Sequence, residues 1–305
     1  MNAQSSRILC VGLATLDVIQ LVARLPESNE KVVALDSLTA AGGPAANAAV
    51  AAAHVGSDVT LMTALADDPV AAIIRADLEA CSVTVRGVPT DAPSVVASIL
   101  VTAGSGDRAI VSPSSSASTS ASGSGSKSAA PSLTESEIDG VLDGVTAVHI
   151  DGYHPELAIP IASAARARGI PVLLDAGSHK PHTEQVLAYV DVAVVSGDFA
   201  PPGVNADPVS VLAYLVDNGI AFAAVTRGPR AIAFRAATTR GGVAVDPVTV
   251  ADTLGAGDFF HGALAHLVAR HGLSEARFPQ DLAWASRVAG ASLGSFGTRA
   301  WLTGT

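Results

Sequence analysis

A glycine-rich turn in the last fifth of the chain ends in an aspartate that is placed to act as a base. Residues 252–258 read Asp-Thr-Leu-Gly-Ala-Gly-Asp and run directly into an apolar segment expected to be helical. Such a turn leaves backbone N–H groups unpaired at the positive end of the helix dipole, where a phosphate oxygen binds well. A carboxylate beside that anion site can accept the proton of a hydroxyl that attacks phosphorus. The turn therefore predicts phosphoryl transfer with Asp258 as base, and an aspartate that only caps the helix is the alternative.

Three further polar motifs stand where apolar segments begin or end. Residues 42–47 read Gly-Gly-Pro-Ala-Ala-Asn and enter an Ala-rich segment, so a ligand can approach the backbone closely and Asn47 can bond a sugar hydroxyl. Asp17 follows the first apolar run, and Thr226 and Gly228 follow a later one. Ligands of open α/β sheets bind beyond the carboxyl ends of the strands, which suits hydroxyl contacts for the first and nucleotide contacts for the others. The alternatives are a solvent-facing Asn, a turn aspartate and a plain strand-end turn.

The elements that must position these residues alternate along the chain. Short runs rich in β-branched residues predict strands at Ile8–Leu13, Val59–Ala64, Ala147–Ile150, Val172–Asp175, Val192–Val195 and Phe222–Val225. Ala- and Leu-rich segments predict helices at Ala45–Val55, Pro69–Ala80, Glu156–Arg168, Pro208–Asn218, Asp258–Arg270 and Asp281–Leu293. This alternation predicts an α/β fold with a doubly wound, mainly parallel sheet and helices on both faces.

Two segments depart from this alternation. Residues from about 18–38 and 94–111 read as partly polar, alternating strands separated by turn residues, which predicts a small accessory sheet that serves as a lid. Residues 112–128 are a Ser/Gly/Ala stretch with too few apolar side chains to offset the entropy of ordering, which predicts a flexible loop. A linker between two independent domains is the alternative. Because the same pattern resumes after the loop, we expect a single domain over residues 1–305.

Composition excludes several classes of protein. The chain has 305 residues and is 49% hydrophobic and 15% charged, which is typical of a soluble globular protein. Its net charge of −10 argues against nucleic acid and anionic membranes as partners. No uninterrupted run approaches the roughly 18 apolar residues that a membrane-spanning helix needs, so the sequence predicts no membrane span. Cys10 and Cys81 have apolar neighbours and form no metal-binding spacing, so we expect a reducing, cytoplasmic location. Secretion through a short signal peptide at residues 8–16 is the alternative.

Together, the four motifs resemble the PfkB (ribokinase-like) carbohydrate kinase family in order and separation across almost the whole chain. The motifs at 42–47 and 252–258 are the two signatures of that family, and both are intact. Within the family the chain looks most similar to the ketohexokinase and sulfofructose kinase branch, on residues 16–19, 148–152 and 195–200. The resemblance implies a ribokinase-like fold and transfer of the γ-phosphoryl group of ATP, with Mg²⁺, to a hydroxyl of a small sugar such as a ketose.

The resemblance also implies roles for the residues that match the family motifs. Asp258 is then the general base, and the backbone amides of Gly255, Ala256 and Gly257 stabilise the transferring group. The implied sugar-binding residues are Asp17, Gly43, Asn47, Arg108 and Asp151. The implied nucleotide-binding residues are Ser196, Thr226, Gly228, Gly255 and Gly257, with residues 289–297 closing around adenine. Asp252 matches a position that helps to bind a monovalent cation in ribokinases, so the resemblance admits a dependence on K⁺.

Three departures from the family pattern bear on these expectations. Residues 196–199 read Ser-Gly-Asp-Phe where many members carry an Asn-x-x-Glu motif tied to magnesium and the phosphates. Ala231 replaces a glycine of the nucleotide loop. Pro44 has no N–H and replaces a polar residue that binds sugar in ketohexokinase, which weakens a specific prediction of fructose.

Other functions stay open at this stage. One is a kinase for a different acceptor, either a nucleoside, for which aromatic residues are scarce, or a sugar phosphate, for which Arg108 is the clear basic candidate near the lid. The other is a catalytically silent sensor of sugar or nucleotide, suggested by the missing Asn-x-x-Glu motif. Because lids of this family often pair between subunits, we expect a homodimer that forms through the β lid.

Overall fold

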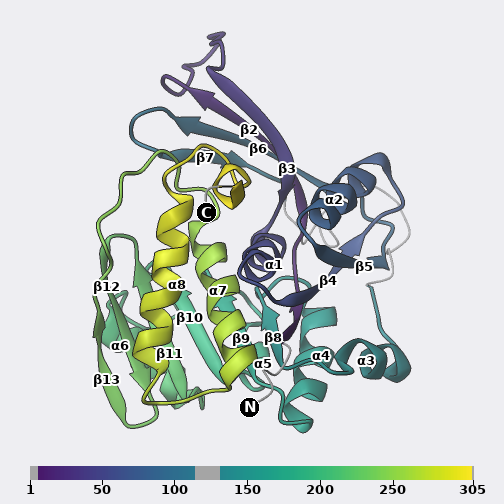
Figure 1. Ribbon diagram of the computed structural model, residues 1–305, viewed down its shortest axis with the longest axis vertical. Coiled ribbons are helices and arrows are strands. Elements are labelled where there is room, and N and C mark those ends of the chain that lie inside the picture. The colour runs from purple at the N-terminus through teal and green to yellow at the C-terminus, as the bar shows by residue number, and fades with distance from the viewer. Residues whose placement is uncertain (1–5, 114–130, 304–305) are drawn as a thin grey trace.

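The computed structural model describes residues 6–113 and 131–303, and the largest element in them is a nine-stranded sheet (Figure 1). Its strand order is β13-β12-β11-β10-β9-β8-β1-β4-β5. The strands are β1 (Arg7–Val11), β4 (Asp58–Leu65), β5 (Val83–Pro89), β8 (Ala147–Ile150), β9 (Val172–Ala176), β10 (Val192–Ser196), β11 (Phe222–Arg227), β12 (Arg230–Ala236) and β13 (Thr239–Val243). Neighbours from β11 to β5 pair in parallel, whereas β12 and β13 are antiparallel. The predicted doubly wound, mainly parallel sheet is confirmed.

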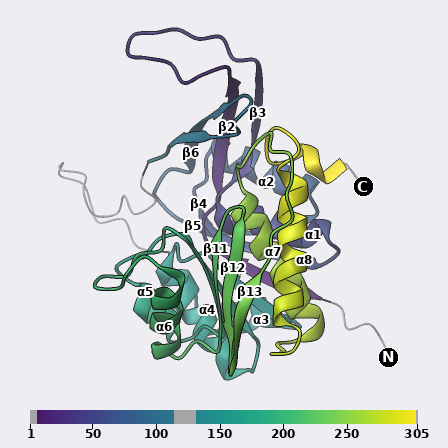
Figure 2. The ribbon, with the colours of Figure 1, turned by 90° about the vertical axis from the view of Figure 1, so that its left-hand side faces the viewer.

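Helices cover both faces of this sheet (Figure 2). They are α1 (Pro44–His54), α2 (Pro69–Ala80), α3 (Glu135–Leu142), α4 (Pro155–Ala167), α5 (Thr183–Leu187), α6 (Pro208–Asp217), α7 (Ala256–His271) and α8 (Phe278–Ser292), with the 3-10 turn η1 (Ala300–Thr303). Helices α1, α2, α7 and α8 pack with Ile8 and Leu173 into one core, and α3 to α6 pack with Leu9 and Leu174 into a second core. Adjacent residues of one strand thus serve opposite faces. In the part of the chain that the structure describes, no helix has the length and apolarity to cross a membrane.

Local sequence explains where several helices begin. Asp68 caps α2 by accepting from the Ala71 N–H at 2.7 Å, and proline occupies the first position of that helix. Thr134 and Glu137 form a reciprocal capping box at the start of α3. By contrast, no side chain caps α1 or α7, the two helices that carry the sequence motifs. At the start of α1, Pro44 has no N–H and the Ala45 N–H donates to Asp151, so it is chiefly the start of α7 that leaves backbone N–H groups available to a ligand.

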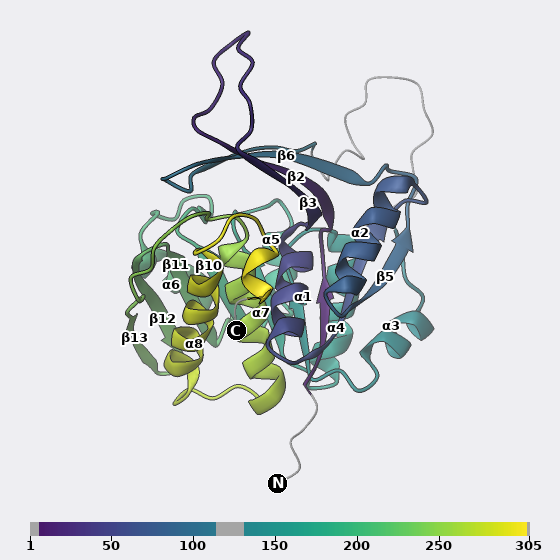
Figure 3. The ribbon, with the colours of Figure 1, turned by 45° about the horizontal axis from the view of Figure 1, so that its top comes forward.

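The second sheet has strand order β3-β2-β6-β7 and lies across one end of the main sheet (Figure 3). Its strands are β2 (Thr15–Val22), β3 (Asp36–Gly42), β6 (Val95–Thr102) and β7 (Arg108–Val111). This is the predicted accessory sheet, with corrected bounds: β2 begins at Thr15, and residues 23–35 connect β2 to β3 instead of belonging to a strand. Asp17 therefore lies inside a strand of the second sheet and not at the end of the first strand of the main sheet. Residues 114–128 of the expected Ser-rich loop lie outside the described residues.

A glycine at 262 lets α7 approach α1 closely, and a side chain there is expected to destabilise the fold. A Cβ atom on Gly262 would lie 2.0 Å from the backbone oxygen of Ala48, so one helix would have to move. We expect Gly262→Ala to lower the free energy of unfolding by about 3 kcal/mol, measured by urea denaturation. Gly140→Ala in α3 is the matched control, because a Cβ there meets no atom within 4 Å, and it should stabilise by up to about 1 kcal/mol. Equal stability of the two variants would contradict the close helix contact.

Candidate active site

The predicted site residues come from distant parts of the sequence, and several of them lie at or next to the carboxyl ends of the central strands. Asp151 directly follows β8, Ser196 ends β10, and Thr226 is the penultimate residue of β11. Asn47 and Asp258 lie in the first turns of α1 and α7, and those two helices pack against each other. This is the edge of the sheet at which ligands of open α/β folds bind.

Asp258 is the third residue of α7 and is bonded to α1. The Asn47 Nδ2 amide donates to Asp258 Oδ2 at 2.9 Å, and the side chain of Asn47 is 2% exposed. Burial raises the pKa of Asp258 to about 6, and the hydrogen bond from Asn47 opposes that rise. The Oδ1 atom of Asn47 is buried and has no hydrogen-bond partner among the described residues. The pair thus joins a carboxylate that ionises near neutral pH to an acceptor atom that is free to take a hydroxyl hydrogen.

Gly255 shapes the turn that precedes this carboxylate. It is the N-cap of α7 with φ of 74°, a left-handed conformation that favours glycine. A Cβ atom at this position would also lie 2.9 Å from the Phe259 ring. Because the turn carries no side-chain cap, the amides of Ala256 and Gly257 lie at the open, positive end of the helix. A helix start of this kind can accept an anion, as the sequence predicts.

Asp17 is buried in β2 with space provided by a glycine in the neighbouring strand. Thr15 Oγ1 donates to Asp17 Oδ1 at 2.6 Å. A Cβ atom on Gly42 would lie 1.9 Å from Asp17 Oδ2, so only glycine leaves room for the carboxylate. Burial raises the pKa of Asp17, while the Thr15 hydrogen bond and the charge of Arg299 lower it. Gly43 has φ of 92°, and a Cβ atom there would meet the Leu13 carbonyl, so the structure requires glycine at both positions of the motif.

Asp151 serves as a junction between three backbone segments. Its Oδ2 atom accepts from the N–H of Leu13 at 2.8 Å and of Ala45 at 3.0 Å, and its Oδ1 atom accepts from the N–H of Tyr153 at 2.8 Å. These bonds join the end of β1, the start of α1 and the end of β8. Burial nevertheless raises the pKa of Asp151. The sequence predicts that Asp151 contacts the sugar. In the structure its carboxylate also holds three backbone segments together, and these bonds occupy much of the hydrogen-bonding capacity of its two oxygens.

The turn before β7 fastens the second sheet to the glycine-rich turn. Arg108 Nη1 donates to Thr253 Oγ1 at 2.8 Å, and Thr253 Oγ1 donates to the Gly106 carbonyl at 2.8 Å. Asp252 is 3% exposed, and its two carboxylate oxygens accept from the N–H of Leu254 and of Gly297, each at 2.9 Å. The signature turn is therefore held from both sides, by the second sheet and by the C-terminal segment.

Two of the predicted nucleotide residues, Ser196 and Thr226, lie side by side on adjacent strands, whereas Gly255 and Gly257 lie at the start of α7. Ser196 of β10 and Thr226 of β11 are partners in register, and Gly228 follows with φ of 58°. Thr226 Oγ1 donates weakly to the Val195 carbonyl at 3.4 Å, and the Asp198 N–H donates to Ser196 Oγ at 3.2 Å. The hydroxyls of both residues thus stay near the strand ends, at the same edge of the sheet as Asp258.

The structure adds two residues to which sequence reasoning gave no role in the site. Asp175, near the end of β9, places its Oδ1 atom 3.3 Å from His261 Nε2 in α7. The signals in the sequence were a polar residue at the end of an apolar run and a histidine three residues after Asp258. Neither signal shows that the two side chains meet, because β9 and α7 are about 80 residues apart in the chain.

Comparison with known proteins identifies the family. The profile described as "pfkB family carbohydrate kinase" matches residues 5–303. The chain belongs to this family. The resemblance drawn from the two sequence motifs is therefore confirmed at the level of the family, over nearly the full length of the chain.

Relatives of this pfkB-family chain include ribokinases. The ribokinase of Bacillus subtilis is 24% identical over 299 residues, which cover 96% of this chain and 95% of that protein. The ATP-dependent ribose-1-phosphate kinase of Halopiger xanaduensis is 27% identical over 173 residues, and the match covers 56% of this chain and 54%, about half, of that protein. The solved structure of Arabidopsis thaliana ribokinase complexed with ribose and ATP has 20% identity and a TM-score of 0.75, and covers 96% of this chain and 94% of that one. It supports the fold.

The narrower resemblance within the family is not supported. The expectation of the ketohexokinase and sulfofructose kinase branch rested on three short segments, whereas the relatives found are ribokinase-like. Short strand-end motifs are shared widely because the same edge of the sheet holds the ligands throughout the fold. They therefore carry less information on the branch than they do on the family.

Proposed function

We propose that this protein is an ATP-dependent kinase that transfers the γ-phosphoryl group of MgATP to a hydroxyl of a small sugar. The observation that carries the proposal is the pairing of Asp258 with Asn47 at the open start of α7. It combines a general base, an adjacent hydroxyl-binding atom and a backbone anion site in one place. These are the parts that phosphoryl transfer asks of a protein, since the reaction proceeds mainly by positioning and charge stabilisation.

In the proposed reaction, the acceptor hydroxyl lies between Asp17, Asn47 and Asp258. Asn47 Oδ1 accepts one sugar hydroxyl, while Asp258 takes the proton from the hydroxyl that attacks the γ-phosphorus. The amides of Gly255, Ala256 and Gly257 then stabilise the charge on the transferring group. Gly43 allows the sugar to approach the backbone. The second sheet, fastened through Arg108 and Thr253, keeps water from the γ-phosphate and suppresses hydrolysis of ATP.

The donor set near β10 fits a magnesium ion held chiefly by the nucleotide. Mg²⁺ retains several waters and takes one or two carboxylates together with substrate phosphates. Asp198 is exposed at the end of β10 beside Ser196, and no group of three or more His, Cys, Asp or Glu forms a metal cluster in the described residues. We propose Asp198 as the carboxylate that faces the ion, with Ser196, Thr226 and Gly228 along the nucleotide. The ion would neutralise charge on the β- and γ-phosphates.

A monovalent cation at Asp252 is a further part of the proposal. Asp252 is buried, and it makes no ion pair with any residue that the structure describes. Its two backbone hydrogen bonds leave oxygen lone pairs for K⁺. Such an ion would offset a buried charge directly beside the turn that forms the anion site.

We also propose that residues 1–305 act as one kinase domain and that two copies pair through the second sheet. Exposed apolar side chains support this pairing: Leu25, Val33, Leu35, Val96, Ile110 and Val111 are each at least 37% exposed, and they belong to the second sheet or to its β2–β3 connection. A second copy of the same sheet would cover such a surface by isologous contact. Sedimentation velocity tests the proposal, and a monomer at micromolar concentration would contradict it.

The test of the activity is ADP release from MgATP against a panel of acceptors, with and without K⁺. The panel contains free ketoses, aldoses, nucleosides and sugar phosphates, and Asp258→Asn is the blank. Turnover of one class that disappears in the blank would establish the kinase and its acceptor class together. Turnover of sugar phosphates alone would assign the acceptor to that class, in line with the ribose-1-phosphate kinase among its relatives. Silence across the panel, with ATP and a sugar still binding by calorimetry, would favour a sensor.

A further inference from the structure

A buried carboxyl–imidazole contact lies beside the proposed base. Asp175 Oδ1 is 3.3 Å from His261 Nε2, and the two side chains are 12% and 7% exposed. Asp175 comes from β9, and His261 comes from the second turn of α7. His261 follows Asp258 by three residues on the same helix, so the two side chains lie on one side of α7. The contact therefore lies about one helical turn from the proposed base along α7.

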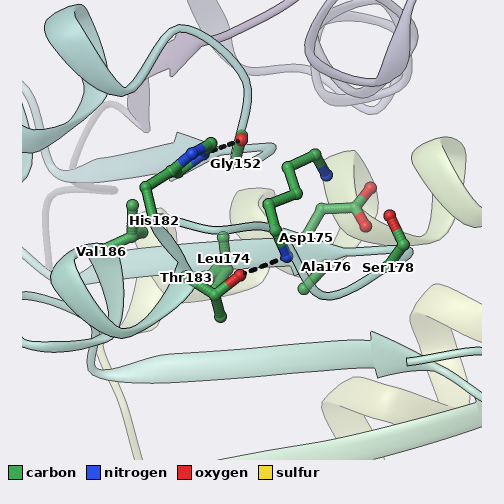
Figure 4. Close-up of a pocket in the computed structure, with 9 residues that line it drawn as sticks. Gly152, Leu174, Asp175, Ala176, Ser178, His182, Thr183 and Val186 are labelled. Carbon is green, nitrogen blue, oxygen red and sulfur yellow. Dashed lines mark hydrogen bonds between the residues drawn. The ribbon is translucent and has the colours of Figure 1, made fainter. Parts of the chain in front are cut away.

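The open side of Asp175 faces a small pocket (Figure 4). The pocket is lined by Gly152, Leu174, Asp175, Ala176, Ser178, Lys180, His182, Thr183 and Val186. The ammonium of Lys180 is 4.3 Å from the centre of the Tyr153 ring and makes no ion pair within 4.0 Å with a described residue. The positive charge of Lys180 therefore acts on Asp175 through space, and the two groups do not form a direct ion pair.

The surroundings disfavour a second negative charge next to Asp258. Burial raises the pKa of Asp175 well above its usual range, the charges of Asp258 and Asp151 raise it further, and the charge of Lys180 opposes them. Burial also lowers the pKa of His261, and the ring of His149, 5.8 Å away, adds to that effect. The titratable groups around the contact are His149 and Asp151 at β8, Cys10 in β1, Asp258 in α7, and Tyr153, Lys180 and His182 in the loops.

We propose that Asp175 and Asp258 form an unequal carboxyl pair, in which Asp175 keeps a proton and donates it to Nε2 of neutral His261 so that Asp258 is the ionised base. This inference rests on the proposed role of Asp258. The proton balance is simple: the acceptor hydroxyl gives its proton to Asp258 during transfer, and Asp175 keeps its own throughout. His261 carries its single proton on Nδ1, which leaves Nε2 as the acceptor. Asp175 and His261 are therefore positioning residues.

The division of roles follows from how two neighbouring carboxyls titrate. Like charges at close range do not both form readily, so one member of such a pair holds the proton and the other ionises. Asp258 has the hydrogen bond from Asn47, which favours its anion, whereas Asp175 has a neutral imidazole, which suits an acid. Burial lowers the pKa of His149 to about 4, so the ring next to His261 is neutral at pH 7, and its two nitrogens have no hydrogen-bond partner among the described residues.

Infrared spectroscopy of the free enzyme tests the inference without reference to activity. At pH 7 we expect the wild type to show a carboxylic-acid C=O band that is absent from Asp175→Asn. Asp207→Asn is the matched control and should keep the band, because hydrogen bonds to Ser210 lower the pKa of Asp207 and asparagine retains the cap of α6. A band of unchanged intensity in Asp175→Asn would overturn the inference.

Activity and a second variant complete the test. Asp175→Asn imitates the protonated acid, so kcat should stay within about threefold of wild type. A fall of about a hundredfold in a folded Asp175→Asn variant would mean that the enzyme needs the anion, and would overturn the inference.

In His261→Leu the acid loses its acceptor and the C=O band should move to higher frequency, whereas His261→Gln should restore the wild-type frequency. If the C=O band does not move in His261→Leu, the inference is overturned. This second variant decides the question even if Asp175→Asn does not fold. If no acceptor is phosphorylated, the infrared result still decides the protonation of Asp175.

Discussion

Replacing Asp258 with Asn is expected to lower kcat by about three orders of magnitude while ATP binds as in the wild type. General base catalysis contributes roughly a hundred- to ten-thousandfold, and asparagine cannot accept the hydroxyl proton. The backbone amides of the glycine-rich turn do not depend on this side chain, so the anion site persists. Steady-state ADP release gives kcat, and calorimetric titration with MgATP gives the dissociation constant.

The control for this variant is Asp207→Asn, which makes the same chemical change at the start of α6. Its kcat should equal that of the wild type. A value for Asp258→Asn within tenfold of wild type would remove Asp258 from the role of base. If Asp258→Asn also loses ATP binding, the substitution disturbs the structure of the turn. Thermal unfolding of the two variants would then show whether Asp258→Asn is less stable than the control.

The same substitution should make the folded protein more stable at neutral pH. Burial raises the pKa of Asp258 from 3.8 to about 6, so between these pH values the folded state binds a proton that the unfolded state has released. Stability therefore falls as pH rises through this window, by up to about 3 kcal/mol at full effect. Asparagine removes that penalty. Burying the carboxylate of the proposed base thus lowers the free energy of unfolding at neutral pH. Such a loss of stability is common at functional sites.

The sequence was sufficient for the parts of the site that are contiguous in the chain. The turn at 252–258 contains two glycines, the proposed anion site and the proposed base within seven residues, so the sequence alone could predict a site of phosphoryl transfer there. Six of the nine strands of the main sheet were also predicted, and four of these, β1, β8, β9 and β10, are buried on both faces and read as continuous apolar runs. Strands β5, β12 and β13 were not predicted. Order and spacing of the motifs then predicted the family.

What sequence could not supply is the pairing of residues that tertiary packing brings together. Asp151 was predicted as a ligand residue, and it also accepts three backbone hydrogen bonds, two of them from segments more than 100 residues away in the chain. Asp17 looked like the end of a buried strand, because the turn at residues 12–14 between β1 and β2 contains Leu13 and Ala14 and carries no polar side chain. The contact of Asp175 with His261 has no local pattern at all. Each case depends on a partner that only the folded chain identifies.

The pH dependence of kcat/KM is expected to show an acid limb near pH 6. Only the ionised form of Asp258 accepts the hydroxyl proton, and its pKa is raised to about 6 mainly by burial. Below this pH the ionised fraction falls tenfold per unit, so activity at pH 4 should be about a hundredfold below its plateau. The profile is measured with saturating MgATP from pH 4 to 9, in a range where thermal unfolding shows that the protein stays folded.

The variant Asn47→Ala distinguishes Asp258 from other groups that titrate in the same range. Phosphate groups of ATP also titrate near pH 6, so an acid limb in the wild type alone does not assign the residue. The hydrogen bond from Asn47 lowers the pKa of Asp258, and its removal must therefore move the acid limb to higher pH. Asn218→Ala, at the end of α6, leaves the site unchanged and should leave the limb in place. Because the titration of ATP is identical in all three proteins, a shift confined to Asn47→Ala assigns the limb to Asp258, and an unmoved limb contradicts that assignment.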